Sequence, residues 1–259
     1  MTFDDILNNF QAYLLVFARV FGIFIFNPLF SRRNVPSIVK IGATIGLTLI
    51  IGNIVLPTTQ IEYGSLALFA IATVKEGFVG VVLGFLTQLF LSTILVAGEL
   101  MDMQSGLGMA KVYDASSGIQ MSLFGSVMTY IFILYFFITN SHLTYIQIFA
   151  TSYDIIPIGF EKINIDFAMV IVNFFGVVLT LAMKLAVPLV VAQLLLEFCV
   201  GILMKTVPQI QVMQVNIQAK LLFGLFLLFV IAGPLANTIE KYIGILIENL
   251  TGALPAIIR

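Results

Sequence analysis

Six long apolar runs follow one another along the chain, and their length limits what it can fold into. They cover about residues 12–30, 38–56, 65–97, 122–139, 165–204 and 221–239. A helix that crosses the hydrocarbon core of a bilayer needs about 20 mostly apolar residues. Only 10% of the residues are charged, whereas a water-soluble domain usually has about a quarter. The sequence therefore predicts an all-α integral membrane protein, and we expect residues 1–259 to form a single domain in contact with lipid.

Two of the runs are too long for one upright crossing. As a single helix, residues 165–204 would extend about 60 Å, which is twice the hydrocarbon thickness. Such a run must tilt strongly, extend out of the bilayer, or fold back as a hairpin where it is interrupted. Pro188 is the candidate interruption here, because proline removes a helical hydrogen bond and clashes with the preceding turn. Lys75 and Glu76 are the candidate interruption of residues 65–97. The sequence thus predicts long, broken helices.

Several function classes lack the residues that they need. A net charge of −1 argues against binding to nucleic acid, which requires a basic surface. His142 is the one histidine in the chain, so an H-E-x-x-H zinc site is ruled out. Gly106 and Gly108 are followed by Met109, where an intramembrane aspartyl protease would need its second acid. We therefore expect a protein that is not an enzyme and that uses no metal or other cofactor.

Charged residues inside the apolar runs need an explanation, since each costs about 2.5–3.5 kcal/mol at the centre of a bilayer. These residues are Arg19, Lys75, Glu76, Lys184 and Glu197. One interpretation is that they line an ion path, as in a secondary transporter. The other is that they pair between helices or subunits. A proton path favours several facing carboxylates, and here two acids accompany three bases, so pairing is the favoured interpretation.

Small residues recur at helical spacing in two places. Gly42 and Gly46 are four residues apart, as are Gly80 and Gly84. Each pair puts two glycines on one helical face, which permits another helix to approach closely. Glu76 precedes Gly80 by one turn and extends that face. The pattern fits packing within the chain and packing against another subunit equally well.

The order of these motifs along the chain resembles the FliR family of export-gate proteins, which occurs in flagellar and virulence type III secretion systems. The resemblance covers nearly the whole sequence. Its motifs are Arg19 and Gly22, Pro28, Val35-Pro36, the series Glu76, Gly80 and Gly84, the series Ala97, Gly98, Asp102, Gln104 and Gly106, the series Ser152, Pro157 and Gly159, and the late series Gly201, Val207, Pro208, Gln209 and Lys220.

This resemblance implies a function and a set of partners. It implies a channel subunit and favours a flagellar over a virulence-associated secretion system. The subunit would lie in the bacterial inner membrane, at the flagellar basal body. The subunit would form helical hairpins in a cone-like assembly with FliP-, FliQ- and FlhB-like subunits. Unfolded proteins would cross through its centre. The alternative from a different class is a secondary transporter that uses the intramembrane charges for ion coupling.

The resemblance also assigns roles to two segments. The polar stretch at the end of the Ala97 to Gly106 series is expected to be a plug inside the pore, and its residues are Gly106, Leu107, Gly108, Met109, Tyr113 and Gly118. Glycines permit tight turns, and methionines are flexible apolar filler. Deleting residues 106–118 is expected to permit assembly but to let small ions leak. Pro208, Gln209 and Lys220 are expected to lie near the entrance of the channel.

Overall fold

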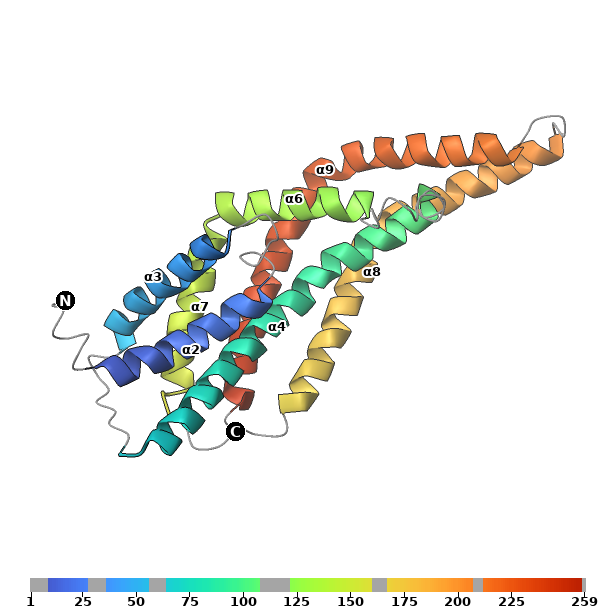
Figure 1. Ribbon diagram of the computed structural model, residues 1–259. Coiled ribbons are helices and arrows are strands. Elements are labelled where there is room, and N and C mark those ends of the chain that lie inside the picture. Colours follow the sequence, from blue (N-terminus) through green and yellow to red (C-terminus); the bar gives the residue numbers. More distant parts are fainter. Residues whose placement is uncertain are drawn as a thin grey trace. The chain divides into compact units, whose positions relative to one another are not determined.

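The computed structural model describes residues 9–27, 36–55, 64–107, 122–159, 167–206 and 212–257, and its regular elements there are all helices (Figure 1). The all-α prediction is confirmed. The helices are α2 (Phe10–Phe26), α3 (Ser37–Val55), α4 (Leu66–Gln104), α6 (Leu123–Ile138), α7 (Ser141–Ile155), α8 (Phe167–Thr206), α9 (Val212–Ala253) and the short 3-10 helix η2 (Leu254–Ile257).

Three of these helices are long and apolar enough to cross a membrane. They are α3, α4 and the Ala168–Leu203 part of α8, and a fourth crossing is formed if α6 and α7 count together as one broken span. α2 has only 17 residues, which is shorter than the roughly 20 that a full span needs. The first apolar run of the sequence therefore gives a helix at the short end of the lengths that cross a bilayer.

The two longest apolar runs form continuous helices. α4 has 39 residues and passes through Lys75 and Glu76 without a break. α8 has 40 residues and keeps Pro188 inside it. The predicted length is present, but the hairpin alternative at these positions is wrong. An interior proline is tolerated in apolar helices because neighbouring groups and small local adjustments satisfy the hydrogen bond that it frees.

The chain divides into two compact units. The first comprises residues 1–90, 140–175 and 243–259. It contains α2, α3, α7, η2, the first part of α4 and the end of α9. Its core is built from apolar faces of α2, α4 and α7, with these fully buried side chains among others: Leu15, Val16, Ile23, Leu83, Leu86, Tyr145 and Phe149.

The second unit comprises residues 91–139 and 176–242. It contains α6, the end of α4 and most of α8 and α9. Its buried side chains include Ile94, Met101, Phe124, Met128, Phe132, Leu185 and Leu189. Because α4, α8 and α9 each contribute to both units, the division does not follow the chain, and a single domain over residues 1–259 stays a prediction.

Candidate functional site

A buried ion pair lies at the centre of the first unit. Nε of Arg19 in α2 is 2.7 Å from Oε2 of Glu76 in α4, and both side chains are 0% exposed. The remaining donors of Arg19 reach α7 and its end: Nη1 donates to the Ser152 carbonyl at 3.1 Å and Nη2 to the Ile156 carbonyl at 2.9 Å. The guanidinium also lies 3.9 Å from the ring centroid of Tyr153. A buried arginine needs this many partners to offset its desolvation.

Glu76 extends the same network to the turn after α7. Its second oxygen, Oε1, accepts a hydrogen bond of 3.0 Å from the backbone N–H of Gly159. Gly159 has a φ of 79°, a left-handed conformation that glycine adopts without steric cost. One ion pair thus holds α2, α4, α7 and the 156–159 turn together.

Glycines permit this close contact between α2 and α4. A Cβ on Gly80 would overlap the carbonyl oxygen of Arg19, and one on Gly84 would lie 2.7 Å from the carbonyl oxygen of Ile23. From the other side, a Cβ on Gly22 would lie 2.5 Å from the backbone of α4. The Glu76, Gly80 and Gly84 face of α4 therefore packs within the chain.

The other glycine pair lies in a different environment. No atom lies within 4 Å of a Cβ built on Gly42 or on Gly46. α3 buries Thr44, Thr48 and Ile51 on another side. The described part of the chain therefore does not cover the Gly42 and Gly46 face of α3.

The remaining charges of the apolar runs are placed nearer the surface. Lys220 Nζ is 3.0 Å from Glu197 Oε2, and the Glu197 side chain is 47% exposed. Lys75 lies on α4, is partly buried, and interacts with another residue. Lys184 is exposed on α8 and forms no ion pair with any residue that the structure describes.

In the second unit, the residues on both sides of the predicted plug are held by hydrogen bonds. α4 ends at Gln104 and is followed by Gly106 with a φ of 80°, which is the usual way for a helix to stop at a glycine. α6 begins after Ser122, whose Oγ accepts a 2.8 Å hydrogen bond from the N–H of Gly125. This is a helix N-cap.

Asp102 joins these two ends directly. Its carboxylate accepts hydrogen bonds from the backbone N–H groups of Leu123 at 2.8 Å and Phe124 at 3.0 Å, and the side chain is 0% exposed. Together with Ser122 it satisfies the first three N–H groups of α6, which have no partner within the helix. Its negative charge also complements the positive end of the helix dipole. Asp102 thereby holds the start of α6 against the end of α4.

A neutral side chain, Gln193 of α8, links the end of α4 to α9. Its Nε2 donates to the Lys220 carbonyl at 2.9 Å and lies 3.4 Å from Ser105 Oγ. Gly224 makes room for it, since a Cβ there would lie 2.7 Å from that Nε2 atom. We call Asp102, Ser105, Gly106, Ser122 and Gln193 the loop anchor.

Comparison with known proteins decides the family. Residues 10–245 match the family model described as bacterial export proteins, family 1. The chain belongs to this family.

Full-length relatives agree with this assignment. The chain is 26% identical over 261 residues to the flagellar biosynthetic protein FliR of Bacillus subtilis (strain 168), covering 98% of each chain. It is 26% identical over 260 residues to FliR of Escherichia coli (strain K12), covering 99% of each. FliR of Borreliella burgdorferi is 25% identical over 269 residues, covering 99% of this chain and 97% of that protein. The resemblance that was predicted from the motifs is confirmed.

Four of the five residues of one motif in this bacterial export protein make contacts or backbone turns that the structure shows. Gly98 touches the backbone of α6 at Gly125, because a Cβ on Gly98 would overlap the Gly125 Cα. Asp102 caps α6, and Gly106 ends α4 with its positive φ. Gln104 Nε2 lies 3.4 Å from Glu197 Oε2. The motif A-G-x-x-x-D-x-Q-x-G thus describes how the end of α4 is attached to its neighbours.

Most of the predicted plug and entrance residues lie outside the described residues. These are Gly108, Met109, Tyr113, Gly118, Pro208 and Gln209. Gly106 and Leu107 are the last described residues after α4, and both are partly buried. Lys220 lies on α9. Ser105, which precedes Gly106, lies beside Gln193, and Gln193 donates a hydrogen bond to the Lys220 carbonyl. Gln104 lies beside Glu197. The sequence did not indicate that these residues lie together.

Replacing Asp102 by alanine is expected to lower the free energy of unfolding by about 2–3 kcal/mol, because two buried N–H groups lose their charged acceptor. The matched control is Glu99→Ala, which removes an exposed carboxylate one turn earlier on α4. Denaturant unfolding of the two variants in detergent, each purified together with its partner subunits, measures both. Equal effects of the two substitutions would mean that Asp102 does not hold α6.

Proposed function

We propose that this bacterial export protein is a channel subunit of a flagellar type III protein export gate. It would reside in the inner membrane, at the flagellar basal body, and assemble with FliP-, FliQ- and FlhB-like subunits to pass unfolded proteins. The proposal is supported by full-length similarity to proteins named for flagellar biosynthesis. It is also supported by three helices of spanning length and composition.

We further propose that residues 106–118 form the movable seal of this channel. The observation that carries this proposal is the loop anchor. A segment that is displaced by each passing substrate needs ends that stay in place, otherwise displacement would unfold the neighbouring helices. Asp102 is buried and bonded to the first two N–H groups of α6, while Gly106 ends α4. These features hold the chain at Gly106 and at the start of α6, on either side of the proposed seal.

The transporter alternative needs intramembrane charges that are available to an ion. Arg19 and Glu76 are not available in this sense, because both side chains are fully buried and bonded to each other and to the backbone of α7 and its turn. Glu197 is half-exposed and pairs with Lys220. This arrangement favours a structural role for these charges.

Purification separates the two functions. A gate subunit is expected to aggregate when it is extracted alone and to be monodisperse when it is co-expressed with FliP- and FliQ-like subunits, because its exposed apolar surfaces need partners. Size-exclusion chromatography with analysis of subunit composition measures this. A chain that is monodisperse alone, binds a small solute and fails to associate with those subunits would contradict the gate assignment and favour a transporter.

A further inference from the structure

A lysine without a counter-ion among the described residues lies in an exposed apolar face of α8. Leu179, Met183, Val187 and Val191 follow one another at every fourth residue of this face, and each is between 43% and 53% exposed. Lys184 lies next to Met183, is exposed, and forms no ion pair with any residue that the structure describes. An open hollow of about 540 Å³ lies around the lysine. The face therefore has room for a side chain that approaches Lys184.

The position of Lys184 along α8 places its charge in an apolar medium. The candidate span of α8 runs from Ala168 to Leu203, and every stretch of 20 residues within it contains Lys184. About 20 residues of a helix cross the hydrocarbon core. Whichever part of α8 crosses, the lysine therefore lies inside the core or at its edge, and inside the core an unpaired charge is costly.

Lipid alone does not solve this problem. A lipid phosphate reaches Lys184 only where the lysine lies at the edge of the core. The exposed apolar side chains of α8 extend from Met169 to Leu203, which is about 50 Å at 1.5 Å per residue, whereas the core is about 30 Å thick. With Lys184 at the edge, the apolar residues on one side of it would stand in water. Lipid thus leaves either a charge in hydrocarbon or an apolar surface in water.

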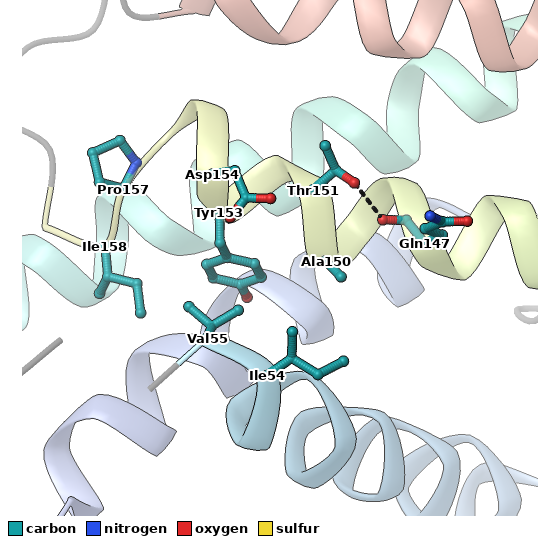
Figure 2. Close-up of a pocket in the computed structure, with 9 residues that line it drawn as sticks. All are labelled: Ile54, Val55, Gln147, Ala150, Thr151, Tyr153, Asp154, Pro157 and Ile158. Atoms are coloured by element: carbon teal, nitrogen blue, oxygen red, sulfur yellow. Dashed lines mark hydrogen bonds between the residues drawn. The ribbon is translucent and has the colours of Figure 1, made fainter. Parts of the chain in front are cut away.

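A second exposed charge shows the difference. Asp154 lines a hollow of about 580 Å³ at the ends of α3 and α7 in the first unit (Figure 2). It is exposed and lies in the last turn of α7, where water can solvate a carboxylate. Lys184 is far from both ends of its helix, so another molecule has to supply its counter-charge.

The apolar row beside Lys184 indicates what that molecule is. Water in an open channel against this face would contact four large apolar side chains for one charge, which is unfavourable. A helix that is apolar except for one carboxylate matches both the row and the lysine. Charged groups in membrane helices usually pair in this way.

We propose that residues 179–191 of α8 dock against an apolar helix of another gate subunit, and that a carboxylate of this helix pairs with Lys184. The inference rests on the proposed function, which supplies the partner subunits, and it names the face and the charge through which one of them binds. A single buried charge pair also fixes the register of two apolar helices, which otherwise slide past one another at little cost. Lys184 is thus the residue that specifies the partner.

Co-purification of the gate from membranes tests the charge pair. The chain carries an affinity tag and is co-expressed with its FliP- and FliQ-like subunits, and the recovery of each subunit is measured. Lys184→Glu is expected to lower the recovery of one subunit at least about tenfold, because two carboxylates would face each other. Lys184→Arg should keep the wild-type recovery. Lys205→Glu is the matched control, since it reverses an exposed charge of α8 beyond the end of the span, and it should behave as the wild type.

Lys184→Met distinguishes a partner from lipid by the direction of its effect. With a partner, its carboxylate would remain buried without a counter-charge, so the recovery of that subunit should fall. With lipid, loss of the charge would raise the amount of this chain in the membrane fraction and leave the recovery of the subunits unchanged. The second result would overturn the inference.

A photo-crosslinking amino acid at Val187 tests the same face with Lys184 intact. In the membranes of intact cells it is expected to form an adduct with another gate subunit, and the linked peptide should come from an apolar helix that contains an aspartate or a glutamate. An adduct with lipid alone, with an exported protein, or with a segment that has no acid would overturn the inference. A wild-type chain that recovers no partner subunit at all would contradict the proposed function itself, and this inference with it.

Discussion

Replacing Arg19 by methionine is expected to lower the free energy of unfolding by about 3–5 kcal/mol, because Glu76 would remain buried without a partner. The two side chains are fully buried and 2.7 Å apart, so water cannot replace the lost guanidinium. The carbonyls of Ser152 and Ile156 would lose donors as well. Denaturant unfolding in detergent of the protein purified together with its partner subunits measures the loss, and the amount of protein in the membrane fraction should fall with it.

A double substitution separates the ion pair from the packing around it. Arg19→Met with Glu76→Leu removes both charges, and apolar replacements of a buried ion pair often restore stability. The double variant is therefore expected to be more stable than Arg19→Met alone. Glu99→Ala, which removes an exposed charge on α4, is the control and should change stability little. An Arg19→Met protein as stable as this control would contradict the structural role of the pair.

The positions of the helices were largely predictable, because long apolar runs leave few other folds. The partner of Arg19 was not. The sequence favoured pairing of the intramembrane charges, but Glu76 is 57 residues away and Lys75 lies beside it, so spacing alone left several pairings open. Continuity at Pro188 was also not predictable, since it depends on neighbouring groups that satisfy what proline frees.

The glycine pairs show a second limit of sequence patterns. Gly42 with Gly46 and Gly80 with Gly84 have the same spacing, yet the second pair packs against α2, and no other described helix lies within 4 Å of a Cβ built on the first pair. A pattern indicates which residues share a helical face and not whether another helix lies on it. Gln193 was missed for a different reason: a search for charges passes over a neutral amide, although a glutamine inside an apolar run also needs partners.

Replacing residues 109–118 by a glycine and serine segment of equal length is expected to open the closed channel to small ions. The replacement removes the apolar side chains of Met109, Val112 and Tyr113. It keeps Asp102, Gly106 and Ser122, so the ends of α4 and α6 should stay as they are. This change is sharper than deletion of residues 106–118, which would also remove the glycine that ends α4. Assembly with partner subunits should therefore be unaffected.

Ionic conductance of the purified gate complex in planar bilayers tests the seal most directly. The wild-type complex is expected to stay near background, and the complex with the 109–118 replacement to conduct at least about tenfold more, because an apolar constriction blocks ions by excluding water. Glu99→Ala, which leaves the segment intact, is the control and should stay closed. A replaced complex that assembles normally and remains as tight as the wild type would contradict the assignment of the seal to this segment.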